Sequence, residues 1–91
     1  MAGFRLTKAY TMPKEELRDA AQGLASRLEQ QHGVRSQWQG DSVRIKGSGV
    51  DGLLSFDDGV VDVSVRLGLL ASAFQGLLKA EVERYLEEHI R

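Results

Sequence analysis

The sequence predicts a two-layer α+β fold, in which an antiparallel meander sheet is covered on one face by two helices. Three observations lead to this prediction. Apolar and polar residues alternate with period two through much of residues 34–67, as in strands with one buried face. Residues 13–32 and 72–90, on either side, repeat apolar residues at helical spacing. A short alternating segment, residues 4–7, precedes the first helical pattern. The expected order is β-α-β-β-β-β-α.

The first helix is expected to begin near Pro13, because the N–H that proline lacks would be unpaired in the first helical turn anyway. Gly33 is expected to end this helix, since glycine readily adopts the left-handed backbone of a C-cap. The apolar stripe between them comprises Leu17, Ala20, Ala21, Leu24, Ala25 and Leu28.

Four strands are expected to follow, near residues 34–38, 43–46, 52–56 and 61–67. Turns are expected at residues 40–41, 47–49 and 57–59, the last containing the Asp-Gly pair typical of a type I′ hairpin. Trp38 is expected to pack a helix on the sheet, with its indole N–H bonded at the edge.

The final helix is expected to begin with a capping box, in which Ser72 and Gln75 satisfy each other's backbone N–H groups. Its predicted apolar stripe comprises Phe74, Leu77, Leu78, Val82, Tyr85, Leu86 and Ile90.

Length and composition exclude several classes of protein. The 91 residues are expected to form a single α+β domain, residues 1–91. The chain has no cysteine, which excludes disulfides and thiolate metal sites. No apolar run approaches the roughly 20 residues of a membrane span, and the N-terminus does not resemble a signal peptide. Basic residues do not form a stripe with interleaved aromatics, so no nucleic-acid partner is expected. These features favour a cytoplasmic protein.

The segment Gly47-Ser48-Gly49-Val50-Asp51-Gly52 matches the spacing G-x-G-x-x-G of a nucleotide-binding loop. Such a loop requires a helix directly after it, with its N-terminus directed at phosphate. Here another strand is expected to follow. The glycines are therefore interpreted as parts of a hairpin turn and of a tight or bulged start of the next strand.

The remaining polar residues do not predict a catalytic or metal-binding site. Four aspartates, Asp51, Asp57, Asp58 and Asp62, lack the spacing of a calcium loop and suit turns and a solvated face. His32 and His89 fall at helix ends, and no serine lies in a nucleophile elbow. Another candidate group is Tyr10, Arg44 and Asp51, but the sequence does not show whether these residues meet in a cleft. We expect a protein that is not an enzyme, with no catalytic, cofactor or metal site.

Leucines occupy the connection between the last strand and the last helix, where polar turn residues are usual. Two interpretations remain: these leucines close the end of the core, or they form an exposed apolar patch for association. The candidate association patch comprises Leu53, Leu67, Leu69, Leu70 and Phe74.

Several segments together resemble the polyhydroxyalkanoic acid system family, also described as polyhydroxyalkanoate granule region proteins. They are residues 13–18, Ser48-Gly49-Val50-Asp51-Gly52, Leu67-Gly68-Leu69-Leu70, Phe74-Gln75-Gly76 and residues 81–86. Two positions depart from the family pattern: Ala73 stands where proline is common, and Ala9-Tyr10 where a histidine often appears.

The resemblance implies a setting, storage granules of polyester, and supplies no catalytic residues. We expect an accessory protein, granule-associated within the cytoplasm, that binds the granule surface or a granule protein. Two alternatives remain open. One is a carrier that holds an acyl-type apolar ligand between helices and sheet, and the other is a structural homodimer formed through an exposed strand edge.

Overall fold

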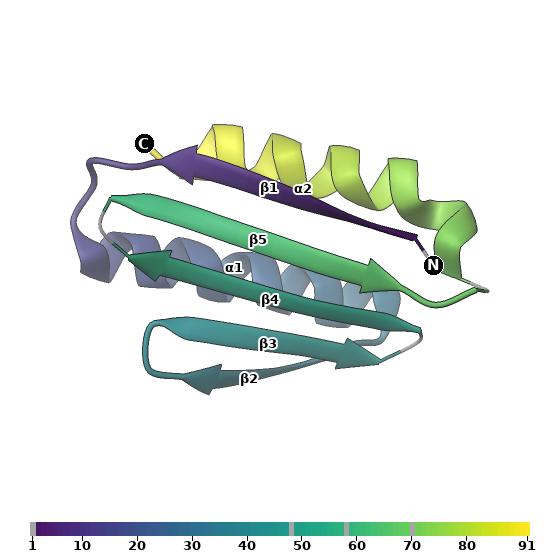
Figure 1. Ribbon diagram of the computed structural model, residues 1–91. Helices are drawn as coiled ribbons and strands as arrows, with labels where there is room; N and C mark the ends of the chain where they lie inside the picture. The colour runs from purple at the N-terminus through teal and green to yellow at the C-terminus, as the bar shows by residue number, and fades with distance from the viewer. Residues whose placement is uncertain (1, 48, 58, 70) are drawn as a thin grey trace.

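The computed structural model describes residues 2–47, 49–57, 59–69 and 71–91. Its elements follow the predicted order, with one short 3₁₀ helix added before the last helix (Figure 1). They are β1 (Ala2–Ala9), α1 (Lys14–His32), β2 (Arg35–Gln39), β3 (Ser42–Gly47), β4 (Val50–Asp57), β5 (Val60–Leu67), η1 (Ala71–Phe74) and α2 (Gln75–His89).

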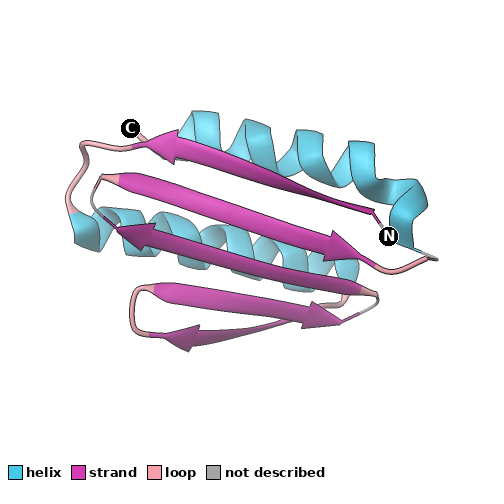
Figure 2. Cartoon of the chain, in the orientation of Figure 1, coloured by secondary structure: helices cyan, strands magenta, loops and turns pink. Residues whose placement is uncertain are grey.

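The five strands form one antiparallel sheet in the order β1-β5-β4-β3-β2. Strands β2 to β5 make the predicted meander, and β1 joins it beside β5. Both helices lie behind the same face of the sheet, α2 along β1 and α1 along β2 and β3 (Figures 1 and 2). The predicted two-layer α+β architecture is confirmed.

The core fills the space between the helices and the sheet. The alternating residues of β5, Val61, Val63, Val65 and Leu67, are all buried on this side, as their period predicts. Helix α1 contributes Leu17 and Leu24, and α2 contributes Val82. No polar or charged residue is buried among the residues that the structure describes. The opposite face of the sheet, called here the open face, is mostly polar, with Leu53 and Val60 as exposed apolar residues on it.

The glycine-rich segment forms the hairpin between β3 and β4. Gly47 and Gly49 have φ values of 139° and 78°, which explains glycine at both turn positions. Gly52 lies within β4, where it pairs with Ile45 on one side and Val65 on the other without an inserted residue. The turn is thus confirmed. The alternative prediction of a bulge at Gly52 is wrong, because the register is continuous across β3, β4 and β5.

The ends of α1 agree closely with the sequence pattern. Pro13 occupies the N-cap, one position before the helix, and the carbonyl of Pro13 accepts from the N–H of Leu17. Gly33 is left-handed, with φ of 69°, and its N–H donates to the Glu29 carbonyl. The predicted glycine C-cap is confirmed.

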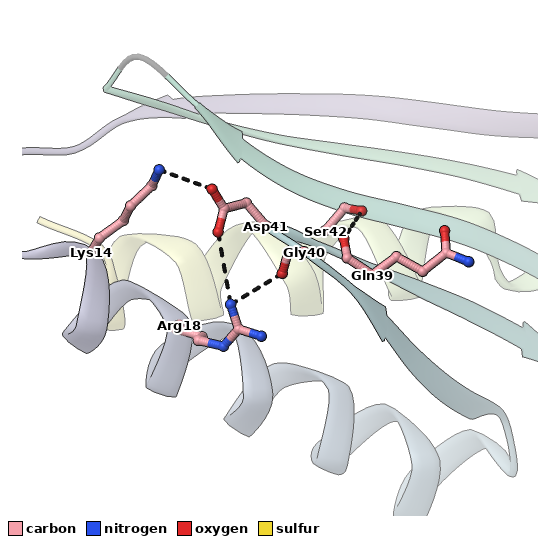
Figure 3. Close-up of polar contacts among 6 residues, drawn as sticks. All are labelled: Lys14, Arg18, Gln39, Gly40, Asp41 and Ser42. Carbon is pink, nitrogen blue, oxygen red and sulfur yellow. Dashed lines mark hydrogen bonds and ion pairs between the residues drawn. The ribbon is translucent and has the colours of Figure 1, made fainter.

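The first turns of α1 are fixed to the β2–β3 hairpin by charged side chains (Figure 3). Lys14 Nζ lies 2.9 Å from a carboxylate oxygen of Asp41. Arg18 Nη1 donates to the Gly40 carbonyl and lies 3.7 Å from the other Asp41 oxygen. The guanidinium of Arg18 also lies 4.5 Å from the centre of the Trp38 ring. These partly exposed contacts join the start of α1 to the β2–β3 hairpin.

Trp38 has the packing role that its position predicted. Its ring meets Phe56 edge to face, with centroids 6.3 Å apart. Its indole N–H donates to the side-chain carbonyl of Gln22 on α1. The residue therefore connects the helix layer to the sheet.

The start of α2 differs from the prediction. Ser72 and Gln75 do not form a capping box: the Ser72 hydroxyl donates to the Leu69 carbonyl, and the Gln75 amide donates to the Gly3 carbonyl. Because residues 71–74 form a 3₁₀ turn, the α-helix begins only at Gln75. The capping box is therefore wrong.

The predicted apolar stripe of α2 is only partly buried. Leu78, Val82, Tyr85 and Leu86 face the core, whereas Phe74 and Leu77 are exposed. Phe74 lies in the 3₁₀ turn before α2, and at 100° per residue Leu77 lies on one flank of the stripe rather than at its centre. Helical periodicity placed them in the core, but the packing of α2 leaves that flank open.

Candidate functional site

The structure divides the five residues predicted to form an association patch. Leu67 is buried, with 2% of its surface exposed, and contributes to the core. Leu53 lies on the open face of the sheet, opposite the helices. Leu69 and Phe74 are exposed by 88% and 60% in the β5–α2 connection. Leu70 lies outside the described residues. Only Leu69 and Phe74 of the five are therefore shown as exposed apolar side chains in that connection.

Leu77 joins this exposed group, with 64% of its surface accessible. Sequence analysis missed it because its spacing suited the core stripe of the helix. We call Leu69, Phe74 and Leu77 the apolar end patch. No spacing in the sequence separates Leu77 from the buried residues of that stripe.

A groove of about 510 Å³ borders the apolar end patch. It lies between the C-terminal end of α1 and the first turns of η1 and α2, and we call it the inter-helix groove. Leu67, Ala71 and Leu78 supply buried apolar surface, and the exposed Phe74 and Leu77 form part of its wall. The remaining lining residues are Gln31, His32 and Val50. Its wall is therefore largely apolar, with polar groups contributed by α1.

A histidine and a glutamate meet beside this groove. His32 Nε2, from the end of α1, lies 3.3 Å from Glu81 Oε2 on α2. The other carboxylate oxygen, Glu81 Oε1, is buried and has no hydrogen-bond partner among the described residues. The sequence assigned His32 only to a helix end and did not single out Glu81.

Behind the groove, a narrow cavity of about 30 Å³ lies between the helices and the sheet. His32, Val50 and Leu78 line both the cavity and the groove. The cavity has room for roughly two water molecules. An acyl chain does not fit in this cavity without displacing core side chains, so the space between helices and sheet lacks the volume that a carrier would need.

The open face carries ion pairs across neighbouring strands. Arg44 Nη1 lies 3.2 Å from Asp51 Oδ1, and the Arg5 guanidinium bonds both oxygens of Asp62. The bonds from Arg5 lower the pKa of Asp62 below its ordinary value. A shallow hollow of about 310 Å³ lies beside Arg44 and Asp51.

Tyr10 does not join Arg44 and Asp51 in a cleft. It follows the C-terminal end of β1 and packs against the core on the helix side. Asp51 and Asp62 are engaged in ion pairs, and Asp58 lies outside the described residues. Within the described ranges, no three histidine or acidic side chains are grouped as a metal site would require.

His89, the second histidine, packs against Tyr85, with ring centroids 4.2 Å apart. It lies in the last turn of α2, where the sequence placed it. Across the described residues, no helix has the length and apolar composition that crossing a membrane requires.

Comparison with known proteins identifies a family whose model covers nearly the whole chain. A family model described as "putative polyhydroxyalkanoic acid system protein" matches residues 5–90. The match includes both helices, all the strands except the start of β1, and the inter-helix groove. Comparison with curated proteins gave no match, and comparison with solved structures gave none. Because the family model spans nearly the entire chain, this protein belongs to the polyhydroxyalkanoic acid system family.

Proposed function

We propose that this protein is a non-enzymatic accessory protein that attaches to polyhydroxyalkanoate granules, through either the polyester surface or a protein on it. The observation that carries the proposal is the exposure of Leu69, Phe74 and Leu77 at one end of a chain that belongs to this family. Exposed apolar groups gathered in one region are typical of association surfaces.

The size of the patch suits reversible attachment. Fully burying a leucine or phenylalanine side chain contributes about 1.5–3 kcal/mol. Three such side chains offer several kcal/mol before the loss of translational and rotational freedom is subtracted. The net binding free energy is then modest for a single molecule, and many molecules on one granule would exchange with the surroundings.

The test is cosedimentation with purified granules, followed by quantification of the bound fraction. Leu69→Asp, Phe74→Asp and Leu77→Asp each place a charge in the apolar end patch, and each should lower the bound fraction. Leu53→Asp is the matched control, because it makes the same change to a partly exposed leucine on the open face. Circular dichroism establishes that every variant is folded.

Granules stripped of their proteins separate the two modes of attachment. Undiminished binding to the stripped polyester identifies the polymer surface as the target, and loss of binding identifies a granule protein. Equal recovery of the folded patch variants and of Leu53→Asp on native granules would contradict the proposal.

A further inference from the structure

We infer that one end of the molecule docks on an anionic lipid layer, with Leu69 of the apolar end patch inserted among the lipids and three cations of the open face at the headgroups. The inference goes beyond granule attachment, because it names a charged lipid surface that can be tested in the absence of polyester. Three observations carry it: the row in which the cations stand, the excess of positive charge there, and the position of that row beside the patch.

The sheet register places the three cations in one row across the strands. Arg35 of β2 pairs with Lys46 of β3, and the row continues through Asp51 of β4 to Arg66 of β5. We call Arg35, Lys46 and Arg66 the basic row. All three side chains are exposed, and among the described residues none of them has a carboxylate within ion-pair distance. The basic row therefore presents positive charge to the solvent.

The neighbouring charges on the open face leave this excess in place. Arg44 is paired with Asp51, and Arg5 is paired with Asp62. Each of these two aspartates is thus balanced by an arginine outside the basic row. Because the whole chain has a net charge of −1, the rest of the molecule is acidic in sum. An anionic surface is therefore drawn to the basic row rather than to the remainder of the protein.

The basic row lies at the same end of the molecule as the apolar end patch. Lys46 and Arg66 are the last residues but one of β3 and β5, and both strands end where the chain turns into η1 and α2 (Figure 1). Val50 and Leu67, which border the row, also line the groove beside the patch. Leu69 follows two residues after the end of β5 and is 88% exposed. Apolar side chains flanked by cations suit a layer with an apolar interior and anionic headgroups.

The spread of the cations favours a surface over one small anion. Arg35 and Arg66 are three strands apart, about 14 Å at the usual spacing of about 4.8 Å between strands. Side chains stand roughly perpendicular to a sheet, so these charges stay separate instead of converging on one phosphate group. The headgroups of a lipid layer can meet each of them independently.

The composition of the open face disfavours a single-stranded nucleic acid as the partner. Such partners stack their bases on aromatic side chains. Among the described residues, no aromatic side chain lies on the open face: Phe4, Trp38 and Phe56 pack on the helix side.

The test is flotation of the full chain with two kinds of vesicle, phosphatidylcholine alone and phosphatidylcholine mixed with phosphatidylglycerol. We expect binding to the anionic vesicles only. This binding should weaken as salt rises from about 0.1 M to about 1 M, because the Debye length falls from about 10 Å to about 3 Å. Equal binding to both kinds of vesicle, or binding to neither, would overturn the inference.

Charge variants assign the binding to the basic row. Lys46→Gln/Arg66→Gln should weaken binding to anionic vesicles about fivefold for each charge removed. Lys8→Gln/Arg84→Gln is the matched control, because it removes the same charge from the helix side of β1 and from α2. The control should bind like the unaltered chain. Equal weakening in the two folded double variants would show that only net charge matters and would overturn the inference.

Leucine variants test the end-on orientation. Leu69→Ser should weaken vesicle binding, because it removes the inserted side chain without adding a charge. Leu53→Ser is the matched control on the open face and should bind normally. A loss in Leu53→Ser as large as that in Leu69→Ser would show that the sheet lies flat on the lipid. Either that result or unchanged binding of Leu69→Ser would overturn the end-on arrangement.

Two further measurements separate the lipid layer from other partners. The vesicles contain neither polyester nor a granule protein, so failure to bind them overturns this inference and leaves granule attachment to its own cosedimentation test. Fluorescence anisotropy with labelled duplex DNA is the second measurement. Binding to DNA that is tighter than binding to anionic vesicles, and that is lost in Lys46→Gln/Arg66→Gln, would identify a nucleic acid as the occupant and overturn the inference.

Discussion

The backbone N–H of Gly68 donates a hydrogen bond to the carbonyl oxygen of Gly49, with 2.7 Å between the two atoms. The two glycines belong to the segments 48–52 and 67–70, on which much of the family resemblance depends. The sheet register pairs Val50 with Leu67 and Asp51 with Arg66. The two segments are therefore neighbours in space, and the glycines allow their backbones to approach closely.

Replacing Gly49 tests this close approach. Gly49→Ala should lower the free energy of unfolding by about 1–2 kcal/mol, because alanine is strained in a left-handed conformation. The added methyl would also lie 3.3 Å from the Ala71 side chain. Gly40→Ala is the control, with a similar φ of 59° but no atom within 4 Å of the new methyl. Urea unfolding should show the larger loss for Gly49→Ala, and equal losses would exclude a contribution from Ala71.

Replacing Gly52 by alanine should have the opposite effect on the free energy of unfolding. Its backbone pairs regularly in β4, and a methyl group there would lie 3.6 Å or more from its neighbours, beside the narrow cavity. Glycine in a strand costs about 0.5–1 kcal/mol relative to alanine. Gly52→Ala should therefore raise the free energy of unfolding by a similar amount.

The control for Gly52 is Gly3→Ala in β1, where a methyl group would meet the backbone carbonyl of Val65. That variant should be destabilised in the same urea experiment. A loss of stability in Gly52→Ala as large as that in Gly3→Ala would show that β4 has no room on its helix side.

The element order could be predicted because each element carries its own local pattern. The alternation from Val61 to Leu67 specifies a strand with one buried face, whichever strands lie beside it. The position of β1 beside β5 could not be predicted, because nothing local in residues 2–9 distinguishes one sheet edge from the other. The pairing depends on the whole set of contacts between strands that are distant in the chain.

The candidate site was less predictable for a related reason. Periodicity assigns a residue to a face of a helix, but it does not give the angle at which the helix packs. Leu77 and Leu78 are adjacent and chemically identical, yet one is exposed and the other buried. The pairing of His32 with Glu81 joins the end of one helix to the middle of another, and no spacing in the sequence marks it.

Substitutions at Tyr85 and Gly23 should have strongly non-additive effects on the free energy of unfolding. The Tyr85 hydroxyl donates to the Ala20 carbonyl on α1, at 2.8 Å, and a methyl group added at Gly23 would clash with that hydroxyl. Tyr85→Phe should lower the free energy of unfolding by about 0.5–1.5 kcal/mol through loss of the hydrogen bond.

Gly23→Ala should destabilise the unaltered chain, even though alanine favours a helix by about 1 kcal/mol over glycine. In the Tyr85→Phe background the nearest ring carbon is 3.6 Å away, so the same substitution should become stabilising. A double-mutant cycle in urea measures this change of sign. Additive effects of the two substitutions would contradict the contact between them.

Alkaline pH should destabilise the protein partly through Tyr85. Burial raises the pKa of its phenol, and the nearby Arg27 guanidinium only partly opposes this shift. Because the folded pKa lies above the unfolded value of about 10, the neutral phenol is favoured in the folded state. This contribution to stability is complete below about pH 10 and is lost as pH rises through the folded pKa.

The difference in unfolding free energy between the unaltered chain and Tyr85→Phe should therefore shrink from about pH 8 to about pH 11. Urea unfolding followed by circular dichroism at each pH measures it. Tyr10→Phe serves as the control, because it also removes one phenol but leaves Tyr85 and its alkaline loss in place. If the stability of Tyr85→Phe falls with pH as steeply as that of Tyr10→Phe, the alkaline loss comes from other groups and the buried phenol is not its source.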